Sequence, residues 1–92
     1  LKALQLSRDG AMPARMELAK LFYRRGILEE SRIYLNDALK MMEPPSAEAL
    51  WLGVRIERKL GNRAAEGGFA SQLRSRYPSA MEYQEFLKGN FE

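Results

Sequence analysis

Apolar residues recur at helical spacing through most of the chain. Leu18, Leu21 and Phe22 lie three or four positions apart with polar residues between them, as on the buried face of an amphipathic helix. Pro13 suits the opening turn of such a helix, because its missing N–H would be unpaired there in any residue. Gly26 suits the left-handed end of the same helix. The pattern therefore predicts a first helix that begins near Pro13 and ends at Gly26.

A second helix is predicted from about Leu28 to the Pro44-Pro45 pair, which cannot continue a helix. Glu29 and Glu30 lie in its first turn, where the helix macrodipole favours negative charge. The residues expected on its inner face are Ser31, Leu35, Ala38, Leu39 and Met42.

The rest of the chain follows the same plan. Ser46 is placed to cap a helix over about 47–59, which Gly61 ends, and the next helix spans about 63–76 with Ala65, Phe69 and Leu73 inward. The capping-box pattern at 79–82 predicts a short helix over about 80–88, ended by Gly89. Gly67 and Gly68 lie inside the helix over 63–76, where each glycine lowers helix stability by about 1 kcal/mol relative to alanine. Either a neighbouring helix approaches closely there or this turn is locally weak, and we favour weakness.

A shift of 34 residues superposes the two halves of this pattern. The matching pairs are Leu18 with Leu52, Ala19 with Gly53, Phe22 with Ile56, Ser31 with Ala65, Leu35 with Phe69, Leu39 with Leu73, and Pro44 with Pro78. Each copy thus has a large residue followed by a small one in its first helix. Its second helix has a small residue and then a large one four positions later, and a proline closes the copy.

This period and this order of residues resemble the tetratricopeptide repeat. The resemblance implies an all-α fold, a right-handed superhelix of antiparallel helix pairs with a short C-terminal capping helix. We expect 1–92 to form a single fragment of such a superhelix. Residues 1–8 would end a preceding repeat, 12–45 and 46–78 would form two repeats, and 79–89 would form the capping helix.

Composition excludes several classes of function. The chain has no Cys and no His, which removes thiol catalysis, Cys/His zinc sites and triads that use imidazole as the base. The paired carboxylates at 29–30 and at 82 and 85 fit solvated helix faces better than a general acid and base. We therefore expect no enzyme activity, no metal and no cofactor.

Charge argues against nucleic acid as a partner. The net charge is +3, and residues 1–45 carry eight basic and six acidic groups while residues 46–92 carry seven and six. A nucleic-acid surface would concentrate positive charge on one segment. No apolar run reaches the roughly 18–20 residues of a membrane span. A protein partner is therefore expected.

A narrower resemblance covers most of the chain and is most specific from residue 44 onward. It is carried by Tyr-Arg-Arg-Gly at 23–26, by Ser-Ala-Glu-Ala-Leu-Trp-Leu-Gly-Val-Arg-Ile-Glu-Arg-Lys-Leu-Gly at 46–61, by Gln-Leu-Arg-Ser-Arg-Tyr-Pro at 72–78, and by Leu-Lys-Gly-Asn-Phe-Glu at 87–92. These segments resemble the carboxyl-terminal part of the PilW/PilF-type proteins, the type IV pilus biogenesis and stability lipoproteins called pilotins.

The resemblance implies a periplasmic protein that a lipid anchors to the outer membrane. Its implied role is to bring the pilus secretin to that membrane and to support secretin multimerisation. The lipidated Cys is expected in a preceding part of the protein, so the present residues would not contact the membrane themselves. The alternative is another bacterial tetratricopeptide-repeat adaptor for envelope or multiprotein complex assembly.

Candidate partner-binding residues follow from the geometry of the repeat, in which the first helix of each pair lines the concave groove. The predicted groove residues are Met16, Lys20, Tyr23, Arg24, Leu50, Val54, Glu57 and Arg58. Their mixture of apolar and basic side chains favours an extended or helical segment with some acidic character. Trp51 adjoins this set and is either a packing residue between repeats, which we favour, or an anchor for the partner.

Overall fold

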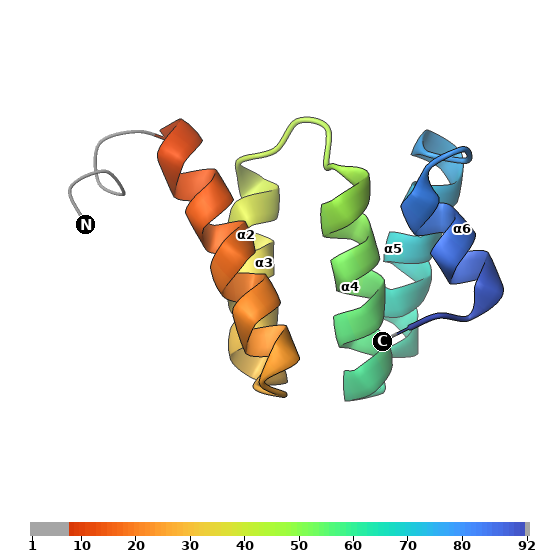
Figure 1. Cartoon of the computed structure of the whole chain (residues 1–92), viewed down its shortest axis with the longest axis horizontal. Coiled ribbons are helices and arrows are strands. Elements are labelled where there is room, and N and C mark those ends of the chain that lie inside the picture. Colours follow the sequence, from red (N-terminus) through yellow and green to blue (C-terminus); the bar gives the residue numbers. More distant parts are fainter. Residues whose placement is uncertain (1–7, 92) are drawn as a thin grey trace. The chain divides into compact units, whose positions relative to one another are not determined.

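The computed structural model describes the backbone of residues 8–91 and the side chains of residues 14–91. The expected end of a preceding repeat at 1–8 lies outside these residues except for residue 8. The described residues form helices and no strand, as the predicted all-α fold requires (Figure 1). The helices are α2 (Arg8–Arg24), α3 (Leu28–Lys40), α4 (Ala47–Leu60), α5 (Arg63–Arg76) and α6 (Met81–Lys88).

The chain divides into two compact units, one ending at Pro45 and the other beginning at Ser46. In the first unit, α2 and α3 pack side by side as an antiparallel pair (Figure 1). In the second, α4 and α5 form a similar pair, and α6 packs against both of them. Each unit therefore has a helical hairpin as its framework.

Three of the helices end in the same motif. The residues after α2, α4 and α6 include Gly26, Gly61 and Gly89, with φ of 79°, 79° and 76°, in the left-handed region that glycine enters without a Cβ penalty. After α4, for example, the amide of Gly61 donates to the carbonyl of Arg58 and the amide of Asn62 donates to that of Glu57. This is the Schellman arrangement, and all three predicted glycine ends are confirmed.

Helix starts agree less uniformly with the sequence patterns. The Ser46 hydroxyl accepts a hydrogen bond from the Ala49 amide at 3.1 Å, as predicted. The capping box at 79–82 was a wrong prediction, because Ala80 occupies the N-cap position of α6 and no side chain caps the helix. The Ala80 carbonyl accepts from the amides of Tyr83 and Gln84, so Ser79 lies one residue too early to cap.

Two predicted helix boundaries need correction. Helix α2 begins at Arg8, so Pro13 lies inside the helix rather than in its opening turn. A proline at this position has no N–H to donate to the carbonyl of residue 9, so one hydrogen bond near the start of the helix is missing. Helix α3 ends at Lys40. Met42, predicted on its inner face, therefore follows the helix and is only half-buried.

The core of the first unit contains a polar contact between its two helices. Ser31 on α3 is completely buried, and its hydroxyl donates to the backbone carbonyl of Ala19 on α2 at 2.6 Å. Leu35 and Ala38 are buried on the same face of α3. A small residue at position 31 thus lets α3 lie close to α2 and satisfies its own hydroxyl there.

Two helices of the second unit approach closely at Gly53. A Cβ at this position would lie 2.8 Å from three carbons of the Phe69 ring, a distance that real Cβ atoms essentially never show. By contrast, nothing lies within 4 Å of a Cβ built at Gly67 or Gly68. The alternative of close approach at this pair is therefore wrong, while the local weakness of the turn stays a prediction.

None of the helices within residues 8–91 combines the length and the apolar character needed to cross a membrane.

Candidate protein-binding surfaces

Helix α2 places four predicted groove residues on one face, because positions 16, 20, 23 and 24 follow helical spacing. Their exposure differs. Met16 and Tyr23 are 6% and 9% exposed, whereas Arg24 is exposed and Lys20 is half-buried. The Lys20 ammonium lies 3.0 Å from the carboxylate of Glu17. The accessible part of this face is therefore basic.

Helix α4 repeats this spacing at positions 50, 54, 57 and 58. Leu50 and Val54 are completely buried and share one apolar cluster with Trp51 and Leu73. Glu57 is 5% exposed and Arg58 is exposed. On both helices the apolar members of the predicted groove set are buried, and an arginine remains accessible. Their contact with a partner stays a prediction.

Arg58 makes two contacts that the sequence pattern did not predict. Its guanidinium lies 3.1 Å from the Glu66 carboxylate of α5 and stands over the Phe91 ring, 4.1 Å from the centroid. Phe91 follows the glycine end of α6, which turns the chain back towards α4. Arg58 therefore links α4, α5 and the segment after α6.

Trp51 is 7% exposed and belongs to an aromatic cluster within the second unit. Its ring lies 5.6 Å from that of Phe91 and 6.3 Å, edge to face, from that of Phe86. The Arg55 guanidinium lies 5.2 Å from the Trp51 ring, within the range of a cation–π contact. The structure thus gives Trp51 packing partners on and after α6, while its role as an anchor for a partner stays a prediction.

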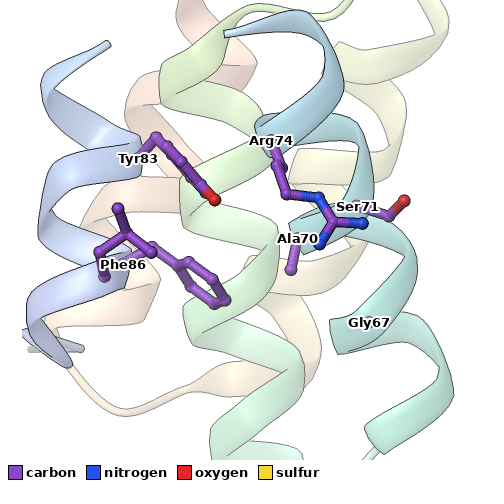
Figure 2. A pocket seen from close by; sticks show the side chains of 7 residues that line it. Gly67, Ala70, Ser71, Arg74, Tyr83 and Phe86 are labelled. Atoms are coloured by element: carbon purple, nitrogen blue, oxygen red, sulfur yellow. The ribbon is translucent and has the colours of Figure 1, made fainter. Parts of the chain in front are cut away.

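A pocket of about 310 Å³ lies between α5 and α6 (Figure 2). Its lining residues are Gly67, Ala70, Ser71, Arg74, Tyr83, Phe86 and Leu87. The sequence pattern does not reveal this site, because the pocket depends on how α6 packs against α5. The only signal in the sequence was a glycine inside a helix with no evident packing reason, followed by a short aromatic helix.

The described part of the chain holds no group of three or more acidic, His or Cys side chains that could bind a metal ion. In both units two helices form an antiparallel pair, and a small residue, Ala19 or Gly53, lies where the two helices meet. The chain is therefore an all-helical protein built on antiparallel helix pairs, an arrangement consistent with the predicted tetratricopeptide repeats.

Comparison with known proteins gives a more specific relationship. No family model matches the chain. Over 85 residues, 92% of the chain, it is 32% identical to the type IV pilus assembly protein PilF of Pseudomonas aeruginosa strain PAO1. A solved structure from a functional characterization of Pseudomonas aeruginosa PilF matches 96% of the chain with a TM-score of 0.77 and 30% identity.

The chain is therefore homologous to PilF, which confirms the resemblance to PilW/PilF-type proteins that the sequence segments indicated. It spans 33% of the length of the PilF sequence and 39% of the solved PilF chain.

Proposed function

We propose that the chain is a non-enzymatic protein-binding scaffold of a pilotin-type pilus assembly protein. In this role it would help to localise the secretin to the outer membrane and support secretin multimerisation. The observation that carries the proposal is the homology to a protein named for type IV pilus assembly, which extends over 92% of the chain. The periplasmic location and the outer-membrane lipid anchor of the full-length protein are part of the same proposal.

Charge supports a protein partner with acidic residues. Arg24 and Arg58 are exposed at equivalent positions of α2 and α4, and the half-buried Lys20 lies one turn before Arg24. Guanidinium groups bind carboxylates through paired, charge-assisted hydrogen bonds. We therefore propose that Lys20 and Arg24 form an accessible basic surface for the secretin in the first unit, and that Arg58 contributes a separate one in the second unit.

A pull-down of the secretin from detergent-solubilised envelope tests this function. The full-length protein and the 92-residue chain are compared side by side as baits. Retention by both would support secretin binding by this chain. Retention by the full-length protein alone would assign binding to other repeats, and retention by neither would overturn the secretin proposal.

Charge-neutralising variants locate the contact. In the bait that retains the secretin, Lys20→Gln combined with Arg24→Gln should reduce retention. Arg63→Gln combined with Arg76→Gln removes the same charge from exposed positions at the two ends of α5 and serves as the matched control. Equal retention by the two double variants would exclude the α2 cations as the binding determinant.

A further inference from the structure

The pocket between α5 and α6 combines an apolar wall with polar groups. Tyr83 and Phe86 extend from α6 towards α5, and the Arg74 side chain extends from α5 at the same opening (Figure 2). The Tyr83 and Phe86 rings stack at 5.9 Å. Gly67 leaves the α5 side open, because nothing lies within 4 Å of a Cβ built there. The result is a hollow with aromatic carbon on one side and hydrogen-bond donors on the other.

The donors of this pocket have no acceptor among the described residues. Among residues 14–91, no hydrogen bond or ion pair is made by the Arg74 guanidinium, the Tyr83 hydroxyl or the Ser71 hydroxyl. The lining contains Arg74 and no acidic residue. The nearby carboxylate of Glu66 is paired with Arg58, and that of Glu85 accepts from the Asn90 amide. The pocket thus offers positive charge that no described acidic side chain pairs with.

We propose that this pocket is a second binding site, distinct from the predicted groove, for a protein segment that carries an apolar side chain next to a carboxylate. The carboxylate would accept hydrogen bonds from Arg74 and Tyr83, and the apolar side chain would pack on Phe86 and Leu87. A guanidinium and a phenol hydroxyl together form a charge-assisted donor set for such an oxygen pair.

Size and exposure favour this occupant. A volume of about 310 Å³ lies at the lower limit of ligand sites in proteins and accommodates one apolar side chain together with a carboxylate. Leu87 is 60% exposed at the pocket, and Met81 on the same helix is 75% exposed. Exposed apolar surface that is rimmed by polar residues is typical of protein-contact sites.

Nuclear magnetic resonance on the 92-residue chain, labelled with nitrogen-15, tests the proposal directly. The probe is the capped peptide acetyl-Gly-Leu-Asp-Gly-amide at millimolar concentration. The comparison peptides replace its Asp by Asn or its Leu by Gly. We expect shifts concentrated at the amides of Gly67, Ser71 and Tyr83, with weaker binding of both comparison peptides. Shifts that are absent, or equal for the Asp and Asn peptides, would overturn the proposal.

The glycine pair supplies a matched pair of variants. Gly67→Leu fills the pocket from α5, whereas Gly68→Leu adds the same side chain at the neighbouring exposed position, which does not line the pocket. Both additions start in open space and both improve helix propensity, so neither should unfold the chain. We expect Gly67→Leu to abolish the shifts and Gly68→Leu to retain them. Equal binding by the two variants would contradict the assignment.

A second pair of variants tests the charge. Arg74→Gln should weaken binding of the Asp peptide by about tenfold, the effect expected for losing a hydrogen bond to a charged group, and Arg76→Gln should leave it unchanged.

Inorganic phosphate and a protein dilution series complete the test. Shifts by phosphate equal to those by peptide would indicate an anion site without a peptide preference. Shifts of the same amides on raising the protein concentration alone would assign the pocket to a second copy of the chain. Either result would overturn the proposal.

Discussion

Gly53 of α4 packs directly against the ring of Phe69 on α5. Three ring carbons would lie 2.8 Å from any Cβ at position 53, so the absence of a side chain sets how closely the two helices approach. The neighbours of Gly53 on α4, Leu52 and Val54, are buried at 1% and 0% exposure. Gly53 itself is buried as well, so a Cβ added there could be accommodated only by a shift of the Phe69 ring or of the helices.

Gly53→Ala should therefore destabilise the chain although alanine is the better helix former. Overpacking of a core typically costs about 1–3 kcal/mol, and the gain in helix propensity offsets about 1 kcal/mol of it. We expect the free energy of unfolding to fall by about 1 kcal/mol, measured by urea denaturation followed by circular dichroism. The double variant Gly53→Ala with Phe69→Leu should recover part of the loss. An unchanged or higher stability of the single variant would refute the steric argument.

Ser31→Ala tests the buried contact between α3 and α2. The variant removes the hydroxyl that donates to the Ala19 carbonyl at 2.6 Å, and a typical hydrogen bond of this kind contributes about 1 kcal/mol of net stability. We expect a loss of that size in thermal or urea unfolding. Asn36→Ala on the exposed face of α3 is the control and should be neutral or slightly stabilising because of its helix propensity. Equal stabilities of the two variants would show that the hydroxyl contributes nothing.

The sequence predicted local features of this fold better than contacts between distant residues. The glycine ends at 26, 61 and 89 and the cap at Ser46 were predicted correctly, because each depends on one residue and its neighbours. The small positions Ala19 and Gly53 were predicted from the repeat and lie at helix contacts. Capping by Ser79 was predicted wrongly. The helix begins one residue later than the pattern indicates, with Ala80 at the N-cap, and the exact first residue of a helix is the part that a sequence pattern defines least well.

The candidate surfaces were less predictable because they depend on tertiary packing. The placement of Phe91 on Trp51 joins residues 40 positions apart, and the α5–α6 pocket requires the orientation of α6 on α5. Helical spacing placed the eight groove residues on two matching faces. It could not show that Leu50 and Val54 are completely buried in a cluster with Leu73.

Phe91→Ala should expose the single tryptophan. Phe91 contacts the Trp51 ring at 5.6 Å and holds the Arg58 guanidinium over its own face. Its removal should shift the Trp51 emission maximum to longer wavelength, increase quenching by acrylamide, and lower stability by about 1–2 kcal/mol. The control Leu87→Ala removes an exposed side chain nearby and should leave the emission unchanged. An unaltered spectrum of Phe91→Ala would contradict the packing of Phe91 on Trp51.

Alanine at Gly67 or Gly68 should have the opposite effect to alanine at Gly53. All three glycines lie inside helices, but a Cβ at 67 or 68 meets no atom within 4 Å. The substitutions therefore only reduce the backbone freedom of the unfolded chain and improve helix propensity, for a gain of about 0.5–1 kcal/mol each. Urea denaturation of the three single variants gives the comparison.

Hydrogen exchange of the α5 amides reports whether the turn at 67–68 is locally weak. In the unsubstituted chain, the amides around 67–68 should exchange faster than those of α4. Gly67→Ala and Gly68→Ala should each slow that exchange. If all three alanine variants changed stability in the same direction, the helix contact at Phe69 would not distinguish Gly53 from the exposed pair.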